Sequence, residues 1–189
     1  MIELDVRRSL DGRLVVIHDD KVDRTTNGRG LVRAKSLAEL RDLDAGMGER
    51  IPTLEEVLEL AAGRTKLVIE LKQDGLEERV IDLIRHYGLV EDLFVVSFKP
   101  LRLRAIKERE PGLKTGLILF AAADPLKSAA SCGADAVAPF RWFITRGLAE
   151  RARKIGMHLF TWTVDDRDKA ERLREMGVSG IVTNKPDLI

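Results

Sequence analysis

The chain opens with the stretch Ile2-Glu3-Leu4-Asp5-Val6, in which apolar and acidic residues alternate. Side chains two positions apart in a β-strand point to the same face, so this pattern predicts a strand that carries both carboxylates on one face. Neighbouring carboxylates repel each other unless water or a cation separates them, and Mg²⁺ or Ca²⁺ prefers such oxygen ligands. The same alternation is also common on the solvated face of an ordinary strand.

A second acidic strand is predicted at residues 67–72 (L-V-I-E-L-K). Its apolar first half is typical of a strand buried on both faces, and Glu70 and Lys72 share one face at its carboxyl end. These two residues could form a simple ion pair. Alternatively, Glu70 is a third oxygen ligand and Lys72 binds phosphate. Charged groups at the carboxyl ends of parallel strands usually line a site, so the two strands together favour a functional site.

A histidine follows the first acidic strand at a short distance. Residues 14–19 (L-V-V-I-H-D) predict a short apolar strand that delivers His18, and a polar, turn-rich segment follows at 23–30. Carboxylates together with an imidazole are the groups that metal-assisted attack on a phosphate ester needs. The other two histidines are expected to be structural or surface residues, because His86 falls in a predicted helix and His158 begins a predicted strand.

Composition limits the classes of function. With 189 residues the chain fits a single domain, 1–189, that can bury a substantial core. Its 32 Lys and Arg balance its 31 Asp and Glu, which does not favour nucleic acid or an acidic membrane surface as a partner. One cysteine excludes a disulfide framework within the chain. There is no apolar run of membrane-spanning length and no visible signal peptide, so a cytoplasmic protein without a membrane span is expected.

Predicted strands and helices alternate along most of the chain, which indicates an α/β fold with a parallel sheet. The predicted strands are 2–6, 67–72, 93–97, 115–120, 135–138, 158–164 and 180–183. Glycines 88, 133, 156 and 177 each end a helix before a strand. Segment 7–50 is predicted to be a β-rich insertion with a tight turn at 10–13 and a short helix near 37–43.

Seven strands are one short of the (β/α)₈ barrel, whose active sites lie at the carboxyl ends of the strands. Ser97 and Trp162 also fall near such ends. An open doubly wound sheet is the alternative, but the first strand is not followed by a glycine-rich phosphate turn.

These residues resemble the glycerophosphodiester phosphodiesterase family. The matching segments run in family order from end to end: I-E-L-D-V (2–6), D-G-R-L-V-V-I-H-D (11–19), D-R-T-T-N-G-R-G (23–30), L-D-A-G (43–46), I-P-T-L-E-E-V-L (51–58), V-I-E-L-K (68–72), V-S-F (96–98), W-T-V (162–164) and G-I-V-T-N-K-P-D (180–187). Taken together they are far more specific than any one motif.

The resemblance implies a (β/α)₈ TIM barrel with a small β-rich insertion, and hydrolysis of glycerophosphodiesters to glycerol 3-phosphate and an alcohol. It implies a divalent ion, Mg²⁺ or Ca²⁺, held by Glu3, Asp5 and Glu70. His18 would be one of two acid/base histidines and Lys72 a phosphate contact, while Trp162 would pack against the glycerol moiety. Ser97, at a strand end, is a further candidate for substrate binding.

The chain departs from the family pattern at its start. The family begins with a strand carrying H-R-G and a helix carrying P-E-N-T, and neither motif is present in this sequence. We therefore expect a barrel that lacks its first strand and helix, with reduced activity and possible self-association. Two other functions stay open: a catalytically impaired remnant that still binds metal and phosphate, and a phosphodiesterase of the lysophospholipase D type.

Overall fold

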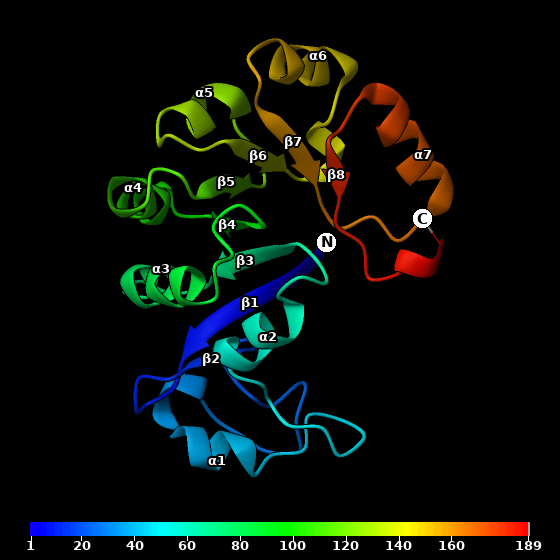
Figure 1. Cartoon of the computed structure of the whole chain (residues 1–189). Helices are drawn as coiled ribbons and strands as arrows, with labels where there is room; N and C mark the ends of the chain where they lie inside the picture. Colours follow the sequence, from blue (N-terminus) through cyan, green and yellow to red (C-terminus); the bar gives the residue numbers. More distant parts are fainter. Residues whose placement is uncertain (189) are drawn as a thin grey trace. The chain divides into compact units, whose positions relative to one another are not determined.

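The structure is a computed structural model that describes residues 1–188, and it comprises two compact units, Met1–Val95 and Val96–Ile189. The elements of the first unit are β1 (Ile2–Arg8), β2 (Leu14–Val16), η1 (Val32–Ala34), α1 (Leu37–Arg41), α2 (Leu54–Ala61), β3 (Leu67–Leu71) and α3 (Glu77–His86). Strand β4 (Leu93–Ser97) spans the boundary between the units. Strands and helices alternate from β3 onward, as the sequence predicts for an α/β fold (Figure 1).

Strand β1 is central in the first unit, where the strand order is β2-β1-β3. Its carboxyl half pairs with β2 in an antiparallel hairpin in which Val6 faces Val16, and Gly12 adopts a positive φ of 80° in the turn. On its other side β1 pairs in parallel with β3, and this register sets Asp5 opposite Glu70. The hairpin is the β-rich feature that the sequence predicts after the first strand.

The remainder of segment 7–50 packs around a small apolar core of its own. Val15, Val22, Val32, Leu40 and Ile51 are at most 2% exposed there. The short helix expected near 37–43 is α1, and Ser36 caps it through a hydrogen bond from the backbone N–H of Glu39. This core supports the segment that carries His18.

The second unit repeats strand and helix with parallel pairing throughout, in the order β5-β6-β7-β8. Its elements are α4 (Pro100–Arg109), β5 (Lys114–Leu119), α5 (Pro125–Ala130), β6 (Ala136–Pro139), η2 (Arg141–Phe143), α6 (Arg146–Lys154), β7 (His158–Thr161), α7 (Arg167–Met176), β8 (Gly180–Ile181) and η3 (Pro186–Leu188). Apolar side chains of the strands and of helices α4 to α7 form one buried cluster, which includes Leu117, Val137, Leu148, Leu159 and Leu173.

Three strands end well before the residues that the sequence predicts. β2 ends at Val16, so His18 lies beyond the strand rather than on it, because the antiparallel pairing with β1 stops there. β7 ends at Thr161, beyond which Trp162 keeps only an isolated bridge to Phe140, and β8 ends at Ile181. The apolar runs at 158–164 and 180–183 continue past the ladder because their last residues pack in the loops at the strand ends. Within the described residues, no helix has both the length and the apolar character needed to cross a membrane.

Candidate active site

Three carboxylates meet where the first half of β1 runs beside the carboxyl end of β3. The sequence places Glu3 and Asp5 near the end of a strand 2–6, but β1 continues to Arg8, so both residues lie before its carboxyl end. The parallel register brings Asp5 beside Glu70, and Glu3 lies two residues earlier on the same face of β1. One oxygen from each of these three side chains lies within 4.8 Å of the others. Glu70 is buried, Asp5 is partly buried and Glu3 is exposed. The face that the alternating sequence predicts to be acidic is therefore a compact oxygen cluster.

Lys72 closes this cluster from the residue after β3. Its Nζ lies 2.8 Å from Glu70 Oε1 and 3.0 Å from Asp5 Oδ1. Asp5 Oδ1 is a buried atom. Although Lys72 lies close to it, no donor among residues 1–188 has the geometry of a hydrogen bond to this oxygen. The simple ion pair is thus present, but one ammonium group does not match the charge of three ionised carboxylates.

The proton affinities of the carboxylates reflect this crowding. Burial, followed by the charges of Asp5 and Glu70, raises the pKa of Glu3 to about 7, and Lys72 opposes the shift. Glu3 retains solvent-exposed surface, so water screens part of this effect. Burial also raises the pKa of Glu70, and the hydrogen bond and charge of Lys72 partly offset the rise. Burial is thus the main cause of both shifts, and the charge of Lys72 offsets only part of them.

The donor set fits a hard divalent cation. Mg²⁺ and Ca²⁺ bind carboxylate oxygens, and a buried carboxylate oxygen without an aligned donor, such as Asp5 Oδ1, has an open acceptor position. A cation there would also relieve the repulsion that raises the pKa of Glu3. Glu3, Asp5 and Glu70 are therefore suited to hold the divalent ion that the sequence predicts.

His18 is attached to the same region through the backbone. Ile17 N donates to Asp5 O at 3.0 Å, and Arg7 Nε donates to His18 O at 2.9 Å. Burial dominates the pKa of Glu70, and an electrostatic interaction with His18 is the last-named of the influences that oppose it. Its side chain is 61% exposed, which leaves the imidazole open to a substrate.

Asp19 and Arg24 orient the imidazole. His18 Nδ1 lies 2.7 Å from Asp19 Oδ1, and Arg24 holds the same carboxylate through Nε at 2.6 Å and Nη2 at 3.0 Å. The hydrogen bond from Arg24, with a further contribution from His18, holds the pKa of Asp19 well below its usual range. An ionised carboxylate only accepts hydrogen bonds, so Nδ1 carries the proton and Nε2 of neutral His18 is left as the basic nitrogen.

The remaining candidates lie in the second unit. Ser97 is fully buried, and its Oγ accepts hydrogen bonds from Lys99 N at 3.2 Å and Arg102 Nη1 at 3.3 Å. Trp162 follows β7, and its indole N–H donates to Ala138 O at 2.9 Å. The ring of Trp162 belongs to an aromatic group at the carboxyl ends of the strands, which is where active sites of barrels are built.

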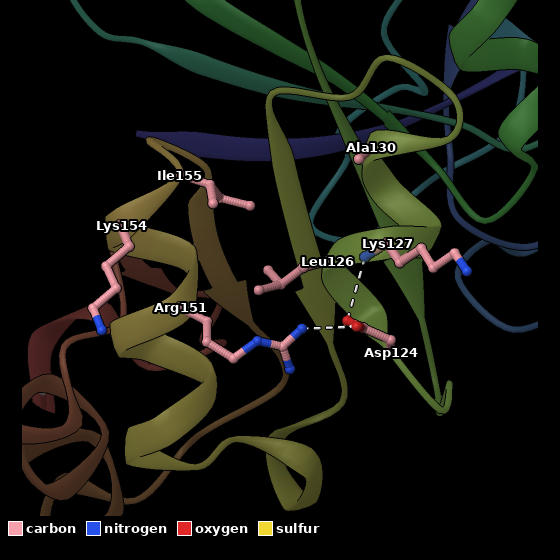
Figure 2. Close-up of a pocket in the computed structure, with 7 residues that line it drawn as sticks. All are labelled: Asp124, Leu126, Lys127, Ala130, Arg151, Lys154 and Ile155. Atoms are coloured by element: carbon pink, nitrogen blue, oxygen red, sulfur yellow. Dashed lines mark hydrogen bonds and ion pairs between the residues drawn. The ribbon is translucent and has the colours of Figure 1, made fainter.

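A hollow of about 320 Å³ lies elsewhere in the second unit, between helices α5 and α6 (Figure 2). Its polar edge is formed by Asp124 and Arg151, which are paired at 2.7 Å, and Lys127 and Lys154 extend toward solvent. The described lining of this hollow contains one carboxylate, Asp124, which is paired with Arg151, and no histidine. It lacks the groups that phosphodiester chemistry needs.

Comparison with known proteins decides the family. The sequence pattern of the glycerophosphoryl diester phosphodiesterase family matches residues 1–188. The chain belongs to this family. A glycerophosphodiester phosphodiesterase of Caldanaerobacter subterraneus subsp. tengcongensis is 42% identical over 202 residues, an alignment that covers 100% of this chain and 83% of the relative. The predicted family and its enzyme class, phosphoric diester hydrolase, are confirmed.

Solved structures of family members confirm the fold class, (β/α)₈ TIM barrel. The glycerophosphodiester phosphodiesterase of Agrobacterium tumefaciens is 34% identical with a TM-score of 0.88, and the match covers 98% of this chain and 84% of that one. A phosphodiesterase of Oleispira antarctica, solved in complex with the product sn-glycerol-3-phosphate, is 28% identical with a TM-score of 0.86, covering 97% and 81%.

The structure brings together Glu3, Asp5, Glu70 and Lys72, which the sequence predicts as one site. Sequence reasoning missed the contacts that link His18, Asp19 and Arg24, although Asp19 and Arg24 lie inside segments that match the family, I-H-D and D-R-T-T. The available signal was the presence of a carboxylate directly after the histidine. Its pairing with Arg24 depends on the turn that follows β2 and is visible only in three dimensions.

Proposed function

We propose that this chain is a divalent-metal-dependent phosphodiesterase that hydrolyses glycerophosphodiesters to sn-glycerol 3-phosphate and an alcohol. The observation that carries the proposal is the cluster of Glu3, Asp5 and Glu70 with Lys72 against two of its carboxylates. The relative that was solved with sn-glycerol-3-phosphate supports this substrate class.

The carboxylates would hold Mg²⁺ or Ca²⁺, which, when bound, supplies positive charge that stabilises the phosphodiester as negative charge builds up on its oxygens. With the ion bound, the Lys72 ammonium, which pairs with Glu70 and Asp5, would be available to the phosphate, because these carboxylates would no longer depend on Lys72 for positive charge. Lys72 thus acts as a positive point charge that binds a phosphate oxygen.

His18 moves a proton at Nε2, because Nδ1 is committed to Asp19. In the reaction that we propose, the glycerol hydroxyl next to the phosphate loses its proton and attacks phosphorus, the other alcohol leaves with a proton, and water opens the cyclic phosphate. His18 serves one of these proton transfers, and such assistance accelerates reactions by about 10²–10⁴-fold. Trp162 and Ser97 remain proposed substrate-binding residues, Trp162 through its ring face.

The test is release of sn-glycerol 3-phosphate from glycerophosphocholine by the purified chain, measured with Mg²⁺, with Ca²⁺ and with a chelator. We expect activity with a divalent ion and its loss in Glu70→Gln. The matched control is Glu59→Gln, which changes an exposed glutamate of α2 and should act like the parent. Equal activity in the chelator, or an active Glu70→Gln, would rule out the metal-dependent mechanism.

One observation favours a second candidate, a binding protein without turnover. His18 is the histidine beside the carboxylates, whereas His86 lies on α3 with its ring edge-on to Tyr87, and His158 begins β7. The family mechanism uses two histidines. A metal titration measured alongside the turnover assay separates the two functions, since saturable metal binding with no release of glycerol 3-phosphate would support the binding protein.

A further inference from the structure

Exposed apolar side chains of the second unit are concentrated at one end of its strands. Among the described residues of that unit, six large apolar side chains are exposed, and five of them follow the carboxyl ends of β4, β5 and β6. These five, here named the apolar rim, are Phe98 (36% exposed), Leu101 (74%), Phe120 (61%), Trp142 (77%) and Phe143 (46%). Water contact with so much apolar surface in neighbouring loops is unusual, and such patches mark interaction surfaces.

The rim rests on a packed aromatic base. Trp162 contacts Phe98, Phe120 and Phe140, with ring centroids 5.6, 5.0 and 5.2 Å away. Phe98 stacks on Phe120 at 5.7 Å, and Phe140 meets Trp142 edge-on at 5.1 Å. The hydrogen bond from the indole N–H to Ala138 O anchors the central ring. Three rings of the rim, those of Phe98, Phe120 and Trp142, therefore rest on a preformed base.

Basic residues flank the rim positions after β4 and β6. The Arg141 guanidinium lies over the rings of Phe140 and Trp142, 4.5 and 5.4 Å from their centroids, and donates to Thr163 O at 2.9 Å. Lys99 and Arg146 are also exposed beside rim residues. Neither stretch 93–107 nor stretch 138–149 contains an aspartate or glutamate. These two stretches thus combine apolar rings with a cationic border of Lys99, Arg141 and Arg146. Acidic residues occur in the loops after β5 and β7, as Asp124, Asp165 and Asp166.

We propose that the apolar rim is a docking surface for an anionic lipid bilayer. Tryptophan and arginine suit the boundary between hydrocarbon and headgroups, since the indole has an apolar body with a polar N–H, and arginine pairs with phosphate. The F-R-W-F segment (140–143) presents both on one short turn, where exposed aromatic rings can enter the acyl region while Arg141 stays at the phosphates. The proposal rests on residues of the second unit alone, and it holds whether or not the chain turns over substrate.

The experiment measures binding of the purified chain to vesicles by sedimentation, with phosphatidylcholine alone or mixed with phosphatidylglycerol. We expect binding to the mixed vesicles that weakens as salt is raised, because salt screens the cationic border. In W142S/F143S the partition coefficient should fall roughly tenfold or more, given the apolar area that each ring would bury. Ile155→Ser is the matched control, since Ile155 is 59% exposed but lies at the end of α6.

Fluorescence locates the contact, because the chain has two tryptophans, Trp142 and Trp162. Trp142→Phe keeps an apolar ring and should retain binding, but the blue shift of the emission on mixed vesicles should disappear. If circular dichroism shows that W142S/F143S does not fold, Phe120→Ser serves as a second variant, and it should also weaken binding to the mixed vesicles.

Several results would overturn the proposal. These are absence of binding to mixed vesicles, an equal loss in Ile155→Ser, and a blue shift that persists in Trp142→Phe. Binding to monomeric lysophosphatidylcholine but not to vesicles would instead make the rim a site for a single lipid chain. Self-association that W142S/F143S abolishes, with no vesicle binding, would make it an interface between copies of the chain.

Discussion

Glu3 is the residue at which protons and a metal ion compete. Burial and the charges of Asp5 and Glu70 raise its pKa to about 7, and a metal ion binds only the ionised form. We therefore expect the affinity for Mg²⁺ or Ca²⁺ to fall as the pH is lowered through about 7, and titration calorimetry over a pH series measures it. In Glu3→Gln the affinity for the metal ion should be weaker overall, and its pH dependence near 7 should flatten. If the affinity of this variant changed with pH as steeply as that of the parent, the titrating group would be another residue.

The same shift affects stability without metal. The pKa of Glu3 in the folded protein, about 7, is above its ordinary value of 4.5, so between these values the folded state holds a proton that the unfolded chain has lost. The contribution of Glu3 to stability is present below pH 4.5 and is lost as the pH rises through about 7. Urea denaturation of the parent and Glu3→Gln in a chelator should diverge across this window, whereas a constant difference would contradict the assignment.

Asp19 is expected to position His18 for proton transfer. Asp19→Asn replaces an acceptor-only carboxylate by an amide, which can donate to Nδ1 and hold His18 in the wrong tautomer. We expect a loss of roughly 10²-fold in turnover and an altered pH profile, with little change in metal binding. Asp20→Asn, a change of the exposed neighbouring carboxylate, is the control and should behave as the parent. Equal effects of the two substitutions would argue against a positioning role.

At the scale of elements, the start of α2 supports the hairpin that leads to His18. Thr53 caps the helix in a capping box with Glu56, and it bridges to Val15 of β2, where Val16 N donates to Pro52 O at 2.9 Å. Removing the hydroxyl in Thr53→Ala should reduce the free energy of unfolding by about 1 kcal/mol, as typical cap losses do. Urea denaturation measures this, and Thr53→Ser should restore most of it. No loss in Thr53→Ala would mean that the cap is dispensable.

Element boundaries were predictable where the signal is local. Glycines 88, 133, 156 and 177 adopt positive φ values of 67°, 72°, 70° and 94°, as the helix-ending joints in the sequence predict. Strand β4 occupies the predicted residues 93–97. The ends of β7 and β8 were not predictable from their apolar runs, because a buried apolar residue in a loop, such as Val164, looks the same in sequence as one in a strand.

At the scale of the whole molecule, metal binding should stabilise the chain against heat. A ligand that binds only the folded state adds about 2.7 kcal/mol at 100 times its Kd, which raises the Tm of a chain of this size by roughly 5–10 °C. Scanning calorimetry with Mg²⁺ or Ca²⁺ should show this rise in the parent and in Glu59→Gln. Glu70→Gln should lose it, since Glu70 is the most buried carboxylate of the cluster. An undiminished rise in Glu70→Gln would place the ion elsewhere.

The sequence by itself determined the family, the α/β class, the positions of most strands and helices, and the acidic face of Glu3 and Asp5. These depend on alternation, glycine joints and motif order, which are properties of residues close together in the chain. Tertiary structure decided what each side chain meets. The parallel register of β1 and β3 sets Asp5 against Glu70 and Lys72, and the turn after β2 brings Arg24 onto Asp19. The ends of three strands gather their aromatic rings around Trp162. Such contacts follow from pairing and packing between distant segments, which no local pattern encodes.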